Sequence, residues 1–295
     1  MANEYEIIIV GGGPAGISAG IYSLRAGMKT LVIDSGNSAL MQAKKIENYY
    51  GVESISGKDL IEKGVAQYKA LGGEFLSSKV VGVRKDYSKN VFSVKVSGGE
   101  YIAKAVILCM GGNKKKTLNL LEDKKFENVS YCAICDGFFY RGLDVAVVGD
   151  DDFAVSESLE LTGIAKNVYL LTNGKAVKEQ KLQNVKVVSS KITEIVGKNT
   201  VQSIVFEDNS KLNIDGLFIA LGTMSSMDTA KQLGVLTKND YIMVDKNYMT
   251  NVAGVFAAGD AIGGLLQVSK AVSDGANAGL EAVRFIKIME QNGKD

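Results

Sequence analysis

Short apolar runs that end in glycine turns recur along this chain of 295 residues. The first run, residues 6–10, precedes a glycine-rich turn at residues 11–16. The pattern after the turn predicts a helix through Arg25, and a second strand is expected over residues 30–33. Apolar runs of this length bounded by glycine are typical of buried strands in a parallel sheet. The N-terminal segment therefore predicts a β-α-β unit.

A second unit of the same kind is expected from Asp144 onward. Its first strand covers residues 145–148, the turn lies at Gly149, and a helix extends through Leu161 to a strand at residues 168–171. Repetition of the pattern predicts two domains of related architecture.

The remaining apolar segments fill in the first domain. Residues 92–96 and 101–108 predict paired strands, and residues 254–260 predict a short buried strand ending in an acid. A helix is expected from about Gln267 to Gln291. The fold class predicted is α/β, with two Rossmann-like, three-layer ββα nucleotide-binding domains, the second inserted into the first.

The first glycine turn has the spacing of a dinucleotide-binding fingerprint. Gly11 allows the tight turn, Gly13 lets the backbone approach a pyrophosphate, and Gly16 lets the helix pack on the strand. The helix N-terminus adds unpaired N–H groups that favour phosphate. Asp34, at the end of the second strand, is placed to accept a hydrogen bond from a ribose hydroxyl.

Two cysteines two residues apart predict a redox function. Cys132 and Cys135 fit one helical turn, where one sulfur can be held as a thiolate with a lowered pKa. Asp136 follows them directly and supplies a proton donor. A structural bridge is disfavoured because so short a loop removes little entropy from the unfolded chain. Cys109, the third cysteine, lies in an apolar run and is expected to be inert.

The composition excludes several kinds of partner and catalytic group. A hydrophobic content of 46% and a formal charge of +1 describe an ordinary globule, with no nucleic-acid partner expected. No apolar run approaches the roughly 18 residues needed to span a bilayer, and no leader opens the chain, so we expect a cytoplasmic protein without a membrane partner. The chain contains no histidine, which excludes histidine bases and Ser-His-Asp triads. No metal site is expected from three cysteines that are not clustered.

Together these motifs resemble the low-molecular-weight thioredoxin reductases over essentially the whole chain. The turn at residues 11–16 matches the FAD fingerprint of that family, and residues 132–137 match its redox motif with only the second spacer changed. Residues 46–51 resemble its flavin-side loop, and residues 258–260 with Gln267 resemble its C-terminal FAD segment. The loop at residues 37–40 departs from the family's Gly-Gly-Gln-Leu type of stretch.

The resemblance implies FAD as cofactor, thioredoxin as partner and a homodimer. It implies that Cys135 faces the flavin, that Cys132 attacks thioredoxin and that Asp136 protonates the released thiolate. With linkers expected at residues 113–116 and near Asp245, residues 1–113 and 246–295 would form the FAD-binding domain and 114–245 the inserted domain. The residues expected to bind FAD are Gly11, Gly13, Pro14, Ala15, Gly16, Asp34, Ser35, Gln42, Asn48, Gly111, Gly259, Asp260, Gln267 and Val268.

The inserted domain departs from the family where NADPH would bind. Asp151 stands at the middle glycine position of the second turn, flanked by Asp150 and Asp152. A like-charge contact near 4 Å costs about 1 kcal/mol in water and several times more in a partly buried site. Residues 172–178 replace the family's arginine-rich segment, and lysine does not give arginine's bidentate recognition of phosphate. We therefore expect this domain not to bind NADPH.

The chain looks most similar to the pyridine-nucleotide-independent branch, the ferredoxin-dependent flavin thioredoxin reductases. Three alternatives remain open: an NADPH-dependent reductase with a weakened nucleotide site, an FAD dithiol oxidase that uses oxygen, and a non-enzymatic redox sensor. Retention of Asp136 argues against the sensor, which needs no proton donor. Ferredoxins are usually acidic, and the lysines expected to steer their docking are Lys44, Lys45, Lys114, Lys115, Lys116, Lys124 and Lys125.

Overall fold

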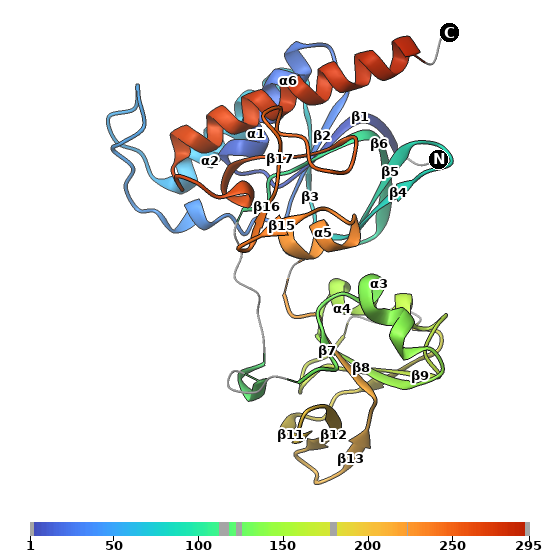
Figure 1. Ribbon diagram of the computed structural model, residues 1–295. Helices are drawn as coiled ribbons and strands as arrows, with labels where there is room; N and C mark the ends of the chain where they lie inside the picture. The colour runs from blue at the N-terminus through green and yellow to red at the C-terminus, as the bar shows by residue number, and fades with distance from the viewer. Residues whose placement is uncertain (1–2, 112–117, 122–125, 178–181, 223, 293–295) are drawn as a thin grey trace. The chain divides into compact units, whose positions relative to one another are not determined.

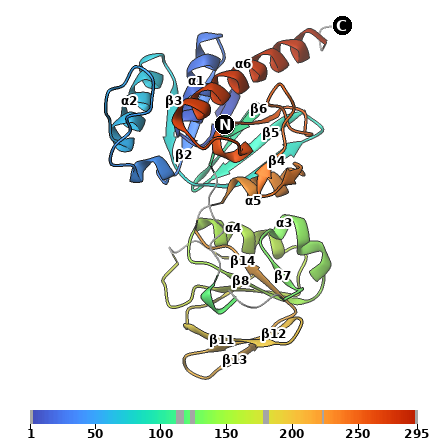
Figure 2. The ribbon, with the colours of Figure 1, turned by 60° about the vertical axis from the view of Figure 1, so that its left-hand side comes forward.

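A computed structural model describes residues 3–111, 118–121, 126–177, 182–222 and 224–292. The chain forms two compact units, one from Met1–Lys114 with Ser225–Asp295 and a second from the intervening Lys115–Met224 (Figures 1 and 2). The first predicted linker, residues 113–116, lies outside the described residues.

The first unit is built on a sheet with the strand order β3-β2-β1-β6-β5-β4, in which β17 also pairs with β6. The strands on either side of β1 run parallel to it, and β4 and β5 add an antiparallel edge. Ile7, Ile8 and Ile9 are fully buried, as expected for a central strand covered on both faces. The strands are β1 (Asn3–Val10), β2 (Thr30–Asp34), β3 (Glu74–Ser77), β4 (Val80–Asp86), β5 (Val91–Val96), β6 (Gly99–Leu108) and β17 (Val255–Ala257).

Two helices of the first unit, α1 (Pro14–Arg25) and α6 (Val268–Asn292), pack closely on each other (Figure 1). Glycines allow this approach, because a Cβ at Gly275 or Gly279 would overlap the backbone of α1. The N-terminal turns of the two helices are thereby brought together. The other elements of the unit are η1 (Ala39–Gln42), α2 (Gly57–Ala70), α5 (Ser226–Gln232), β15 (Thr237–Lys238), β16 (Tyr241–Ile242) and η4 (Gly259–Ile262).

The second unit contains a parallel sheet of order β10-β9-β8-β14-β7 and a small antiparallel sheet β11-β12-β13. Apolar side chains of both sheets form one core cluster. Its elements are η2 (Asn119–Leu121), β7 (Val129–Ser130), α3 (Ala133–Asp136), η3 (Gly137–Tyr140), β8 (Asp144–Val148), α4 (Asp152–Leu161), β9 (Asn167–Leu171), β10 (Val185–Val188), β11 (Ile192–Gly197), β12 (Val201–Phe206), β13 (Lys211–Asn213) and β14 (Gly216–Ile219).

The α/β fold class with Rossmann-like parallel sheets is as predicted, and each strand and helix expected from the pattern is present to within a few residues. One segment differs: the strand expected through Asp260 ends at Ala257, and η4 follows it. No helix in the described part of the chain is long and apolar enough to cross a membrane.

The second domain boundary, expected near Asp245, was wrong. Residues 225–245 belong to the first unit, which begins again at Ser225. Long-range hydrogen bonds hold this segment there: the Gln232 side chain accepts from the Val83 N–H at 3.0 Å, and Ser226 Oγ donates to the Gly111 carbonyl at 2.7 Å. Contacts with strands far away in sequence, which composition does not reveal, decide the boundary.

Candidate active site and cofactor site

The first glycine turn connects β1 to α1 and needs its glycines for steric reasons. Gly11 has φ of 109°, and a Cβ there would overlap the Cys109 carbonyl. A Cβ at Gly16 would overlap the Gly11 carbonyl. Gly13 is the N-cap of α1, and among the described residues no side chain caps this helix. The first N–H groups of α1 are therefore available to an anionic ligand.

Asp34 is tied to this turn by its carboxylate. Its Oδ1 accepts from the Gly12 N–H at 2.9 Å, and its Oδ2 accepts from the Gly36 N–H at 2.9 Å. A carboxylate has about four lone-pair positions, so each oxygen can still accept from a ligand hydroxyl. The arrangement fits the role in ribose binding expected for Asp34.

A pocket of about 590 Å³ opens beside the turn. This volume is within the usual range for small-molecule sites, about 300–1,000 Å³. Of the predicted residues, Gly13, Pro14 and Val268 line the pocket, together with Tyr49 and Val272. The N-terminal ends of α1 and α6 thus face one cavity of a size suited to a small-molecule ligand.

The loop that precedes α6 joins a second pair of predicted residues. Asn48 Nδ2 donates to Gln267 Oε1 at 2.8 Å, across 219 positions of sequence. Ser35 is exposed in the loop after β2, and Gln42 is exposed at the end of η1. The structure gives neither of these two a contact that relates it to the pocket.

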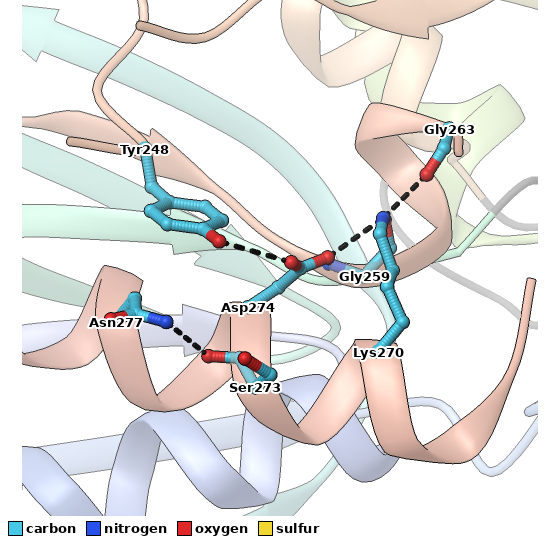
Figure 3. Close-up of polar contacts among 7 residues, drawn as sticks. All are labelled: Tyr248, Gly259, Gly263, Lys270, Ser273, Asp274 and Asn277. Carbon is cyan, nitrogen blue, oxygen red and sulfur yellow. Dashed lines mark hydrogen bonds and ion pairs between the residues drawn. The ribbon is translucent and has the colours of Figure 1, made fainter. Parts of the chain in front are cut away.

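A polar network fixes η4, which contains the predicted residues Gly259 and Asp260 (Figure 3). Lys270 Nζ pairs with Asp274 Oδ2 at 2.7 Å and donates to the Gly259 carbonyl at 3.0 Å and to the Gly263 carbonyl. Asp274 in turn accepts from the Gly259 N–H at 3.2 Å and from the Tyr248 hydroxyl at 3.2 Å. The lysine therefore holds both ends of the turn.

Cys109 has no redox role in this arrangement. It is buried, and burial followed by the negative charge of Asp274 raises the pKa of its thiol. A buried thiol of raised pKa stays protonated and unreactive, as expected for this residue.

The two redox cysteines form a disulfide at the start of α3. Cys132 is the N-cap of this short helix, and its Sγ accepts from the Cys135 N–H at 3.2 Å. Cys132 is 2% exposed, whereas Cys135 is exposed. The predicted placement of both cysteines in one helical turn is confirmed, and only one of the two sulfurs belongs to an accessible residue.

Asp136 lies at the end of the same helical turn and is held by Ser130. The Ser130 hydroxyl donates to Asp136 Oδ2 at 2.6 Å and accepts from the Cys132 N–H at 3.1 Å. Burial, and secondly the negative charge of Asp136, raise the pKa of the Tyr140 hydroxyl. The carboxyl group is thus connected to the backbone of Cys132 by one hydroxyl.

The second turn, between β8 and α4, differs from the first at its N-cap. Asp151 is the N-cap of α4, and its Oδ1 accepts from the Phe153 N–H at 3.2 Å and the Ala154 N–H at 3.4 Å. Its neighbour Asp150 pairs with Lys175 at 2.9 Å. The Asp151 carboxylate therefore occupies the first N–H groups of α4. The equivalent N–H groups of α1 are left to a ligand.

Four residues that contact these sites did not follow from sequence reasoning: Ser130, Lys270, Asp274 and Glu157, whose Oε2 accepts from the Ala133 N–H beside Cys132. Two signals could have found the last three. Glu157 is a charged residue three positions after Ala154 and four before Leu161, both fully buried, so it lies on the apolar face of α4. Lys270 and Asp274 are an i,i+4 pair at the start of a long helix.

Comparison with known proteins agrees with this geometry. The model of one family, Pyridine nucleotide-disulphide oxidoreductase, matches residues 5–275. The chain belongs to this family. Among curated relatives, thioredoxin reductase of Aquifex aeolicus (strain VF5) is 35% identical, over 96% of this chain and 93% of the relative. The 34.2 kDa protein in the rubredoxin operon of Clostridium pasteurianum is 33% identical, over 96% and 97%.

Solved structures agree as well. The atypical thioredoxin reductase TRi from Desulfovibrio vulgaris Hildenborough is 36% identical, with a TM-score of 0.84 over 96% of this chain and 98% of that one. A ferredoxin-flavin thioredoxin reductase from Clostridium acetobutylicum is 31% identical, with a TM-score of 0.68 over 98% and 100%. The chain is thus a flavoprotein disulfide oxidoreductase of the thioredoxin reductase type, with FAD as its cofactor.

Proposed function

We propose that this protein reduces the disulfide of thioredoxin through FAD and the Cys132–Cys135 pair, with electrons from reduced ferredoxin instead of a pyridine nucleotide. FAD, when bound, accepts single electrons and passes two to a disulfide. The observation that carries the choice of donor is the capping of α4 by the carboxylate of Asp151. Similarity to a solved ferredoxin-flavin thioredoxin reductase supports the same choice.

The capped helix disfavours a nucleotide in two ways. A pyrophosphate at α4 would have to displace the Asp151 carboxylate from the Phe153 and Ala154 N–H groups, and would then face that carboxylate at close range. Each like-charge contact near 4 Å costs about 1 kcal/mol in water and more where the site is partly buried. Lys175, which follows β9, is already paired with Asp150 and offers no bidentate recognition of a 2′-phosphate.

The first unit keeps the features expected of an FAD site. Gly13 leaves the N-terminal N–H groups of α1 open, Asp34 is held at the turn, and η4 is fixed by Lys270 and Asp274. We infer that α1 and α6 hold FAD while the second domain serves mainly to carry the disulfide.

In the proposed reaction, Cys135 faces the flavin and Cys132 attacks thioredoxin, while Asp136 protonates the thiolate released during exchange. The exposure of Cys135 supports its flavin-facing role. Cys132 is buried, so its role requires that the cysteine become accessible once the disulfide opens and thioredoxin docks.

Two exposed aromatic side chains next to the disulfide support a protein substrate. Phe138 and Phe139 are 67% and 75% exposed and lie in η3, immediately after the redox helix. Large apolar side chains exposed together are typical of interaction sites. We propose that thioredoxin docks on this aromatic pair.

Ferredoxin docking is proposed to use lysines on the first unit. Lys44 and Lys45 are exposed, although Lys45 pairs with Glu47 at 2.8 Å, which reduces the local positive charge. The other lysines expected to contribute, at positions 114–116, 124 and 125, lie outside the described residues.

The test is anaerobic mixing of the purified protein with NADPH, NADH or reduced ferredoxin while flavin absorbance is followed. We expect ferredoxin to bleach the flavin and both nucleotides to fail at micromolar concentration. Ferredoxin-reduced protein should then reduce thioredoxin disulfide. Rapid bleaching of the flavin by micromolar NADPH would contradict the proposal and indicate a nucleotide-dependent reductase. Oxygen consumption with a dithiol and no other acceptor would favour the dithiol oxidase.

A further inference from the structure

A buried carboxylate lies against the redox helix. Glu157 is 2% exposed on the inner face of α4, and its Oε2 accepts from the Ala133 N–H at 2.5 Å. Ala133 is the first residue of α3 and follows Cys132 directly. Burying a carboxylate is unfavourable unless hydrogen bonds compensate, and the Ala133 N–H supplies one such bond directly beside Cys132.

Backbone N–H groups at the start of α3 favour a thiolate on Cys132. A cysteine at a helix N-terminus has a lowered pKa because unpaired N–H groups stabilise the charged sulfur. The Cys135 N–H already donates to Cys132 Sγ at 3.2 Å. Glu157 accepts the Ala133 N–H, so an ionised carboxylate at this position places its negative charge one peptide bond away from Cys132. It therefore opposes the effect of the helix start on this one sulfur.

We propose that Glu157 is a positioning residue that directs the negative charge of the reduced pair to Cys135 and keeps Cys132 protonated. The proposal rests on the proposed use of Cys132–Cys135 as the redox pair. In the step concerned, two electrons from the reduced flavin break the S–S bond. One proton goes to the Cys132 sulfur, and Cys135 keeps its charge as a thiolate. The reduced enzyme thus holds a neutral Cys132 until its protein substrate docks.

The same elements carry four other titratable groups: Asp136 on α3, Tyr140 on η3, and Asp152 and Glu160 on α4. Asp136 is bonded to Ser130, whose hydroxyl also contacts Cys132 backbone atoms, so its charge lies toward Cys132 as well. Its side chain is only partly buried and is screened by water, whereas Glu157 is screened much less.

The test measures the pKa of each cysteine directly. The chain has three cysteines, so full-length holoenzyme labelled with ¹³C at cysteine Cβ gives three signals, which Cys→Ser variants assign. The reduced protein is titrated anaerobically, as wild type and as Glu157→Gln, which keeps an acceptor oxygen for Ala133 without the charge. We expect the pKa of Cys132 to fall by about one unit in the variant while that of Cys135 stays unchanged.

Glu160→Gln is the matched control, because it removes a charge from the same helix and leaves the Ala133 hydrogen bond intact. An unchanged Cys132 pKa in Glu157→Gln, an equal fall at Cys135, or an equal fall in Glu160→Gln would each overturn the proposal. If Glu157→Gln does not fold, Glu157→Asp, which withdraws the charge by one methylene, is expected to lower the Cys132 pKa by less than one unit; no change there also overturns it.

Failure of the redox assignment has a different signature. In that case Cys132→Ser or Cys135→Ser would still reduce thioredoxin, whatever the titration of Glu157→Gln. An active wild type with two inactive serine variants and an unaffected Cys132 pKa would count against Glu157 alone.

Discussion

The carboxylate of Asp136, which follows Cys135 directly, is held by one hydroxyl, that of Ser130. We expect Asp136→Asn to keep the fold and to slow thiol exchange with thioredoxin by about 10²-fold or more, the usual contribution of a positioned acid or base. Rapid mixing of prereduced enzyme with thioredoxin disulfide measures this step apart from flavin reduction. Glu160→Gln, which removes a carboxylate from α4, is the control. An Asn variant of undiminished rate would assign the proton to water or to another group.

The two cysteines differ in exposure, and their serine variants should differ in absorbance. Both variants are expected to lose thioredoxin turnover. Cys132→Ser retains the flavin-facing Cys135 thiolate, so a long-wavelength band from thiolate and flavin should appear in its visible spectrum. Cys109→Ser is the control, since the buried Cys109 thiol has a raised pKa and stays protonated. Appearance of the band in Cys135→Ser instead would reverse the two roles.

The helices α1 and α4 begin in equivalent turns but differ in the side chain at the N-cap. A Cβ at Gly13 meets only Ser38 Oγ, at 3.6 Å, so Gly13→Asp is expected to fold. The new carboxylate would cap α1 as Asp151 caps α4, and the purified variant should be colourless. Circular dichroism checks the fold, and absorbance after incubation with FAD checks the site. A yellow Gly13→Asp protein would contradict this account of α1.

The reciprocal change at α4 is expected to do little. Asp151→Gly removes the cap, but Asp150 and Asp152 still flank the turn and Lys175 still pairs with Asp150. Flavin bleaching by NADPH should therefore remain absent in this variant. Full NADPH activity after the single substitution would mean that the Asp151 cap alone excludes the nucleotide.

The turn η4 is held by Lys270 from the first turn of α6 (Figure 3). Lys270→Met should weaken FAD binding by about tenfold or more, because a hydrogen bond to a charged group contributes about 1.5–3 kcal/mol. Fluorescence titration of apoprotein with FAD measures the affinity. Lys287→Met, an exposed lysine on the same helix, is the control and should bind FAD normally. Equal affinities in the two variants would limit Lys270 to a structural role.

Association of the whole protein with an acidic donor should depend on salt. Ferredoxin-driven turnover is expected to fall as ionic strength rises, because the Debye length drops from about 10 Å at 0.1 M to about 3 Å at 1 M. Stopped-flow flavin reduction over a salt series measures the effect. Reduction by an uncharged photoreductant serves as the control. A ferredoxin rate independent of salt would remove the lysines at positions 44 and 45 from the docking surface.

Local spacing was enough to predict much of this protein. Each of the informative patterns involves residues that are close together in sequence. These patterns are the glycine turns, the alternation of strands and helices, and the C-x-x-C followed by an acid. Elements such as α1 and β6 were therefore predicted close to their observed bounds. The roles of the cofactor-binding and catalytic residues, Ser35, Gln42 and the two cysteines among them, stay predictions.

Only tertiary structure decided the rest, because the deciding contacts join residues far apart in sequence. Gln232 bonds to Val83 and so places residues 225–245 in the first unit. Glu157 reaches the Ala133 N–H, 24 residues away in sequence, only because α4 packs against α3. The sequence indicated that Asp151 replaces a glycine. The fold determined that its carboxylate bonds to the helix N–H groups, since backbone conformation sets where those donors point.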